Sequence, residues 1–197
     1  MNMKLFTGYC LIVLLMLGGC SRSVTRIASS TQTDLSGRWN DTDSRLTANV
    51  MMEQMFGNLG SQWASEFQQR NQRRPVIIVG LVSNKSHEHI SAEIFIKDLE
   101  NAIIRNGSIR LVEAGDNRNE LRLERADQQD FASLETAKSW GRELGADFML
   151  QGTINSIVDG YRRNQAIYYQ IDLRLTNIET NEVTWVGNNE IKKMVRN

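Results

Sequence analysis

IYYQIDLRLT, residues 167–176, places an apolar side chain at every second position. Strict period-two alternation of this length predicts a β-strand with one face buried and the other in water. The polar run Glu179–Glu182 predicts a short turn, and Val183 and Trp185 then resume the same alternation. The C-terminal part of the chain is therefore expected to close with a β-hairpin.

Three further strands are predicted upstream of this hairpin. Residues 76–82 form a continuous apolar run rich in β-branched side chains, which is typical of a strand covered on both faces. Polar residues 83–87 are expected to leave that strand as a loop. The stretch from Ile109 to Val112 predicts a short strand, and Phe148–Ile157 predicts another.

Helical spacing of apolar residues predicts two helices before these strands. The first is expected to begin near Asp41, with Asp41, Thr42 or Asp43 as its N-terminal cap. Its predicted apolar face consists of Leu46, Val50, Met51 and Met55. A second, short helix is expected to carry Trp63 and Phe67.

Three more helices are predicted after the first strand. Ser91–Asn106 shows helical spacing and is followed by Gly107, the residue type that favours the end of a helix. Asp116–Gln129 is predicted to be a highly charged helix, and Ser133 can cap another that stops at Gly145. The order α-(α)-β-α-β-α-α-β-β-β indicates an α/β (α+β) sandwich. In it, a mixed or antiparallel sheet of four to five strands is flanked by helices and closed by the C-terminal β-hairpin.

The N-terminal residues have the anatomy of a bacterial secretion signal, with a positive charge at Lys4 and a short apolar run at Leu11–Leu17. That run is too short for a membrane span, which needs about 20 residues. It ends in Leu17-Gly18-Gly19-Cys20, which resembles the lipobox of bacterial lipoproteins. The resemblance implies cleavage before Cys20 and acylation of its sulfur, and Ser21 favours the outer membrane. The expected domains are a signal peptide at 1–19, a lipidated N-terminus with a flexible tether at 20–40, and a single globular domain at 41–197.

Charge and motif content argue against several classes of function. Lys and Arg number 23, as do Asp and Glu, so no basic excess supports nucleic-acid binding. His87 and His89 are too few for a zinc site, which needs three or four ligands, so we expect no metal and no other cofactor. No Gly-x-Ser-x-Gly elbow or phosphate-binding loop is present in the sequence. We therefore expect no catalytic residues, while a Ser–His–Asp triad, which is set by space rather than sequence, stays an open alternative.

Two segments are candidates for binding a partner protein. Trp39 precedes the predicted domain, and it either packs the N-terminal arm onto the sheet or contacts a partner. The polar loop after residue 82 is expected to be exposed, and loops often carry binding residues. The candidate partner-binding residues are Trp39, Asn84, Lys85, His87, Glu88 and His89.

Several stretches together resemble one family of lipoproteins. They are residues 34–44, 74–80 with 84 and 88–90, 145–152 and 178–185. The chain is similar there to the LpoB family, the outer-membrane lipoprotein activators of penicillin-binding proteins. The resemblance implies a periplasm-facing protein without enzymatic activity, which docks on a bifunctional class A penicillin-binding protein and stimulates peptidoglycan synthesis in the cell wall. The predicted tether departs from the family pattern, because it is short and has no proline.

Two alternatives are kept open by the residues. The predicted domain also resembles the periplasmic part of curli-type secretion lipoproteins, which implies a structural or oligomeric envelope lipoprotein. A pore of that kind needs amphipathic strands beyond the one alternating hairpin, Ile167–Trp185. A periplasmic hydrolase is disfavoured because the search for catalytic motifs fails.

Overall fold

The computed structural model describes residues 23–57, 60–131 and 143–196. The chain divides into two compact units, Met1–Thr31 and Gln32–Asn197. In the first unit the described residues are irregular, with a turn in which the Thr31 N–H donates to the Ala28 carbonyl at 3.0 Å. The second unit contains the helices and strands and begins at Gln32, ahead of the predicted start at Asp41.

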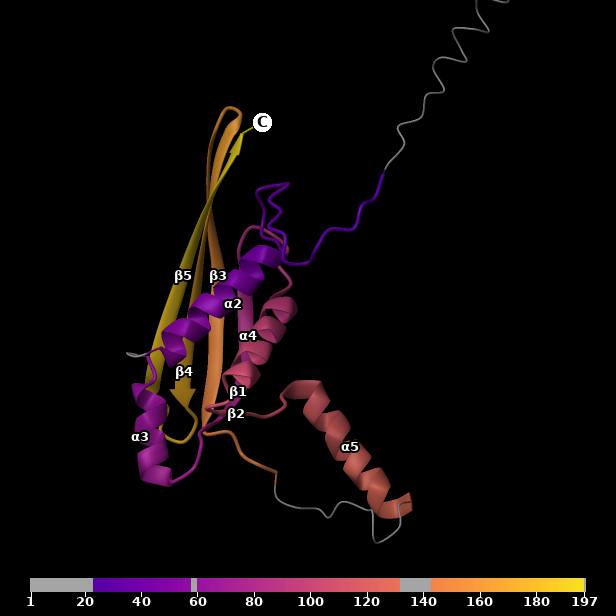
Figure 1. Ribbon diagram of the computed structural model, residues 1–197, viewed down its shortest axis with the longest axis vertical. Coiled ribbons are helices and arrows are strands. Elements are labelled where there is room, and N and C mark those ends of the chain that lie inside the picture. Colours follow the sequence, from indigo (N-terminus) through magenta and orange to yellow (C-terminus); the bar gives the residue numbers. More distant parts are fainter. Residues whose placement is uncertain (1–22, 58–59, 132–142, 197) are drawn as a thin grey trace, which may run out of the picture. The chain divides into compact units, whose positions relative to one another are not determined.

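The second unit is built on a five-stranded mixed sheet with the strand order β2-β1-β3-β4-β5 (Figure 1). Its strands are β1 (Val76–Lys85), β2 (Arg110–Leu111), β3 (Phe148–Tyr161), β4 (Asn164–Asn177) and β5 (Val183–Arg196). β1 runs parallel to both β2 and β3, whereas β3, β4 and β5 are antiparallel to their neighbours. The predicted α+β architecture and its C-terminal β-hairpin are thereby confirmed.

Four described helices accompany the sheet: α2 (Asp41–Phe56), α3 (Gln62–Asn71), α4 (Ala92–Asn106) and α5 (Gly115–Phe131). α2 and α4 pack against each other, and they contact β5 and β1 respectively on one face of the sheet (Figure 1). The predicted inward face of β4 is confirmed, because Ile167, Tyr169, Ile171, Leu173 and Leu175 are all buried. They form the core together with apolar side chains of α2 and α4, among them Met51, Met55, Phe95, Leu99 and Ile103.

The N-terminal cap of α2 differs from the prediction, because Asn40 caps the helix instead of Asp41, Thr42 or Asp43. The Asn40 side-chain oxygen accepts the N–H groups of Thr42 at 2.9 Å and Asp43 at 3.2 Å. In return, the Asp43 carboxylate accepts the Asn40 N–H at 2.9 Å. This reciprocal arrangement is a capping box, and it places Asp43 inside the first turn of the helix.

The predicted apolar face of α2 is correct at Met51 and Met55 and wrong at Leu46 and Val50, which are 51% and 37% exposed. The buried stripe instead contains small and polar residues, including Thr47. The Thr47 hydroxyl accepts a hydrogen bond from the Asn189 amide of β5 at 3.0 Å. This hydrogen bond gives the buried hydroxyl a partner, so a polar residue is tolerated on the buried stripe, which hydrophobic periodicity does not register.

β1 and β3 extend beyond their predicted bounds, whereas β2 is shorter than predicted. Residues 83–85, which were expected in a loop, continue β1 and pair in parallel with 153–155 of β3 after an irregularity in the register. Main-chain pairing does not require apolar side chains, so the hydrophobic pattern underestimates strand length. The predicted helix beginning at Ser133 falls mainly on residues 132–142, outside the described residues. α4 ends at Gly107 as predicted, with φ of 70°.

Candidate functional site

Glu88 joins the candidate loop to the N-terminal arm, residues 33–40. Its carboxylate accepts the Trp39 N–H at 3.1 Å and the Tyr169 hydroxyl at 2.7 Å. Tyr169 is fully buried. Its burial, and to a smaller extent its hydrogen bond to Glu88, raise the pKa of its phenol. The phenol therefore stays protonated and serves as a permanent donor to the carboxylate.

The Trp39 ring lies against the core of the domain. It makes edge-on contacts with Tyr169, at 5.6 Å between ring centroids, and with Phe95, at 6.4 Å. Of the two roles expected for this side chain, the structure describes the packing role, in which Trp39 holds the arm onto the sheet. The half-buried ring is thus a positioning element for the arm.

A network of short hydrogen bonds fixes the loop after β1. The Asn84 amide nitrogen donates to the Glu88 carbonyl at 2.8 Å, and the Asn84 side-chain oxygen accepts from the Ser86 N–H at 2.9 Å. The His87 N–H donates to the Ser156 hydroxyl of β3 at 2.9 Å. Asn84 and Glu88 therefore turn inward and support the loop.

Three of the candidate residues are exposed here: Lys85 at the last position of β1, and His87 and His89 on the supported loop that follows it. The loop is held at both ends, so these side chains are presented on a fixed backbone. They are the exposed members of the predicted set, although His87 also contacts the Ser156 hydroxyl, whereas Trp39, Asn84 and Glu88 are less exposed and are engaged within the domain. Cys20, the predicted acylation site, lies outside the described residues.

Lys193 provides a second attachment for the arm, which sequence reasoning missed. Its ammonium nitrogen lies 2.8 Å from Asp34, 2.6 Å from Asp43 and 3.0 Å from the Arg38 carbonyl. Burial opposes the charge on Lys193, but the hydrogen bonds to both aspartates outweigh it and raise the pKa of Lys193. The same contact, aided by Gln32 and Asn40, lowers the pKa of Asp34 to about 2. A lysine at an inward position of β5 was the available sequence signal.

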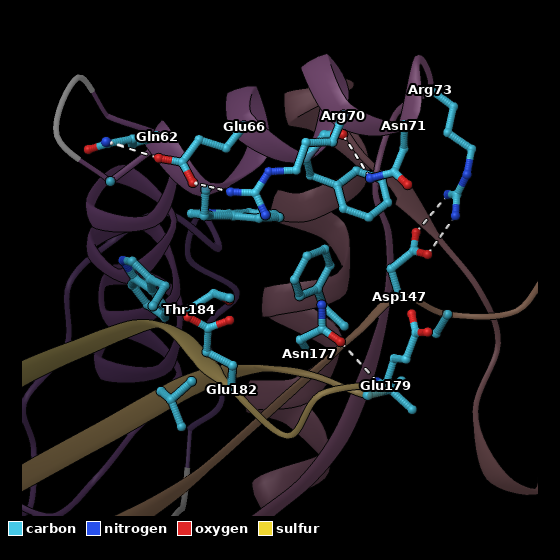
Figure 2. Close-up of a pocket in the computed structure, with 18 residues that line it drawn as sticks. Gln62, Glu66, Arg70, Asn71, Arg73, Asp147, Asn177, Glu179, Glu182 and Thr184 are labelled. Carbon is cyan, nitrogen blue, oxygen red and sulfur yellow. Dashed lines mark hydrogen bonds and ion pairs between the residues drawn. The ribbon is translucent and has the colours of Figure 1, made fainter.

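A polar cleft of about 620 Å³ lies at the other end of the sheet, between α3 and the β4–β5 turn. Figure 2 shows Glu66 and Arg70 on the α3 wall and Glu179 and Glu182 on the facing wall. Arg73 and Asp147 also line the cleft, and they form a two-pronged ion pair with both N–O distances at 2.7 Å. Sequence reasoning did not predict this cleft, because its walls come from segments far apart in the chain.

The described residues offer no arrangement for bond chemistry at the loop. His87 Nδ1 lies 3.1 Å from the Ser156 hydroxyl, the start of a possible nucleophile–base pair. The neighbouring carboxylate, Glu88, is bound by Trp39 and Tyr169. It therefore does not complete a triad with His87 and Ser156. Among the residues whose positions are described, no group of three or more His, Cys, Asp or Glu side chains could hold a metal ion. No described helix is long and apolar enough to cross a membrane.

Comparison with known proteins gives one family. The sequence profile of the family described as "Peptidoglycan-synthase activator LpoB" matches residues 43–191. No curated protein sequence matches the chain.

Several solved structures are similar. The LpoB C-terminal domain from Escherichia coli is 22% identical, with a TM-score of 0.43, over 79% of this chain and 99% of that one. The LpoB C-terminal domain from Salmonella enterica is 20% identical, with a TM-score of 0.41, over 76% and 98%. The NMR structure of Escherichia coli LpoB is 19% identical, with a TM-score of 0.42, over 91% and 87%.

Proposed function

The chain belongs to the LpoB family of peptidoglycan-synthase activators, and from this membership we propose that it binds and activates a bifunctional class A penicillin-binding protein. The observation that carries the proposal is the family match over residues 43–191, which extends from α2 into β5. The family is one of activators, so we propose that the chain performs no bond chemistry itself. The family match does not favour the alternative of a structural or oligomeric envelope lipoprotein.

We also propose that the protein is anchored through an acylated Cys20 in the outer membrane and faces the periplasm. The support is the sequence Leu17-Gly18-Gly19-Cys20, together with Ser21. Two or more acyl chains hold a protein firmly at a bilayer, whereas one chain binds reversibly. A diacylated or triacylated Cys20 would therefore keep the activator at its membrane.

Activation requires that the protein bind the active conformation of the synthase more tightly than the inactive one. We assign contact with the synthase to the exposed loop residues Lys85, His87 and His89. Asn84 and Glu88 hold this loop in place through hydrogen bonds of 2.7–3.1 Å, and Trp39 is held by the same carboxylate. A loop fixed before binding loses little conformational entropy on association, which favours affinity.

The test is glycan polymerisation by a purified class A synthase on lipid II, with and without the chain from residue 20 onward carrying Cys20→Ala. The protein is expected to raise the polymerisation rate and to retain the synthase on a column. Lys85→Glu with His89→Glu should reduce both effects, while the exposed α4 variant Arg105→Glu should leave both intact. No stimulation by the parent protein and no retention of the synthase would refute the proposal.

A further inference from the structure

The strands β3, β4 and β5 extend past the end of β1 (Figure 1). The last paired residue of β1, Lys85, lies opposite Asn155, whereas β3 continues to Tyr161. Beyond that point the sheet is a three-stranded ribbon formed by residues 157–167 and 192–196, here called the ribbon tip.

Large apolar side chains are exposed on one face of the ribbon tip. Ile157 is 64% exposed, Tyr161 is 73% exposed and Met194 is 62% exposed. Ile157, Asp159 and Tyr161 occupy alternate positions of β3. Met194 lies across Ala166 from Asp159, so these side chains share a face. This is the face opposite to the one covered by α2 and α4, since inward-facing Ile167 lies at the alternate position.

The ribbon tip also carries an excess of positive charge. Its cations are Arg162, Arg163, Lys192 and Arg196, and Lys193 is already paired with the arm. The Arg162 guanidinium lies 5.3 Å from the centroid of the Tyr161 ring. Within the described parts of the chain, none of the four cations makes an ion pair, and the acids nearby are Asp159 and Glu190. Exposed apolar and aromatic side chains beside unpaired cations suit an anionic lipid surface.

The N-terminal arm, at the start of the compact unit Gln32–Asn197, lies beside the ribbon tip. Asp34 is ion-paired with Lys193 at 2.8 Å, and a Cβ added to Gly37 would meet the Val195 side chain. The chain between Cys20 and Gln32 spans at most about 40 Å when fully stretched. As a flexible coil it averages roughly 20 Å. An acyl group on Cys20 would therefore keep the ribbon tip within a short distance of the bilayer.

We propose that the ribbon tip docks on the anionic phospholipid surface of the membrane that holds the protein. This inference rests on the proposed acylation of Cys20. The cations approach the lipid phosphates, and the exposed side chains of Tyr161, Met194 and Ile157 meet the boundary between the headgroups and the acyl chains. The cleft and α3 lie at the opposite end of the sheet, so docking of the tip directs them away from the membrane (Figure 1).

The test measures partition onto vesicles by the chain from residue 20 onward with Cys20→Ala, which removes the acyl contribution. Vesicles of phosphatidylethanolamine with phosphatidylglycerol are expected to retain the protein, and phosphatidylcholine vesicles are not. Each cation near an anionic surface strengthens partition by roughly fivefold, so Arg162→Gln with Arg163→Gln should weaken it by about 25-fold. Added salt should weaken it as well. Ile157→Ser with Met194→Ser should also reduce it.

The matched control is Arg105→Gln with Arg110→Gln, which removes the same charge from exposed positions outside the ribbon tip. It should partition like the parent protein, and thermal unfolding checks that all variants fold. Equal partition onto both vesicle types, or equal loss in the tip and control variants, would overturn the proposal.

The synthase assay in solution, without vesicles, separates this inference from the proposed function. The variant Arg162→Gln with Arg163→Gln should stimulate the synthase like the parent, because no membrane is present. Lost stimulation would mean that the tip contacts the synthase, and lipid docking would then be refuted. Stimulation by a parent protein that does not partition onto vesicles would refute docking and leave the proposed function standing.

Discussion

The ammonium nitrogen of Lys193 lies 2.6 Å from a carboxylate oxygen of Asp43, and this ion pair joins β5 to the first turn of α2. Both side chains are about nine-tenths buried. Asp43 also accepts the Asn40 N–H, so one carboxylate serves both the helix cap and the ion pair. The arm, the helix start and the last strand are therefore energetically connected through these residues.

Replacing Lys193 with methionine should destabilise the domain by about 2–3 kcal/mol. The change leaves the Asp43 carboxylate buried without its cation, and an unpaired buried charge costs more than the pair contributed. Urea denaturation measures the free energy of unfolding. Lys192→Met is the matched control, because Lys192 is exposed on the other face of the same strand and should change stability by less than about 0.5 kcal/mol. Equal losses in the two variants would contradict the role assigned to Lys193.

Replacing Tyr169 with phenylalanine should cost about 1–2 kcal/mol and loosen the arm. The variant keeps the buried ring but removes the hydroxyl that donates to Glu88 at 2.7 Å. Limited proteolysis within residues 33–40 should become faster than in the parent. Tyr168→Phe, on the opposite face of β4, should leave the proteolysis rate unchanged. A double-mutant cycle with Glu88→Gln measures the coupling energy between Tyr169 and Glu88. Strictly additive losses of stability would contradict the hydrogen bond between them.

Replacing Asn40 with alanine should reduce stability by about 1 kcal/mol. The change removes the side-chain oxygen that accepts two N–H groups at the start of α2. Thermal unfolding followed by circular dichroism measures the loss. Asn49→Ala, at an exposed position inside the same helix, should be neutral or slightly stabilising, because alanine is the better helix former. A destabilisation at Asn49 as large as that at Asn40 would argue against the cap.

Stability should fall between about pH 4 and pH 2 in part because of Asp34. Its pKa is lowered from 3.8 to about 2 in the folded protein, chiefly by the hydrogen bond from Lys193. A carboxyl group whose folded pKa is depressed contributes stability above its unfolded pKa and loses it as pH falls through the folded pKa. Asp34→Asn should therefore flatten the pH dependence of the urea midpoint in this window. A slope identical to that of the parent would contradict the assigned pKa.

The sequence was informative where structure follows from local periodicity. The β4–β5 hairpin was predicted because alternate residues of β4 bury one face, and α4 because its apolar spacing ends at Gly107. The cap of α2 was missed by one residue, since four polar side chains in a row could each serve. Hydrophobicity placed Leu46 and Val50 in the core, whereas the buried stripe contains Thr47, whose hydroxyl is bonded to Asn189 of β5.

The candidate site was only partly predictable, because its decisive contacts join distant segments. Glu88 was identified as an exposed docking residue, yet its carboxylate is engaged by Tyr169 and by Trp39, which lie 81 and 49 residues away. Lys193 was overlooked, because its two aspartates lie 150 or more residues upstream. No local pattern encodes such pairings. The cleft beside α3 was missed for the same reason.

The double attachment of the arm has a mechanical consequence. If Cys20 is acylated as we propose, tension in the N-terminal segment reaches the Asp34–Lys193 ion pair first and the Trp39–Glu88 hydrogen bond next, before it reaches the main chain of α2. Force is thus delivered first to the end of β5 and to the loop after β1. Tension in the segment between Cys20 and the arm would therefore also disturb the loop that we assign to contact with the synthase.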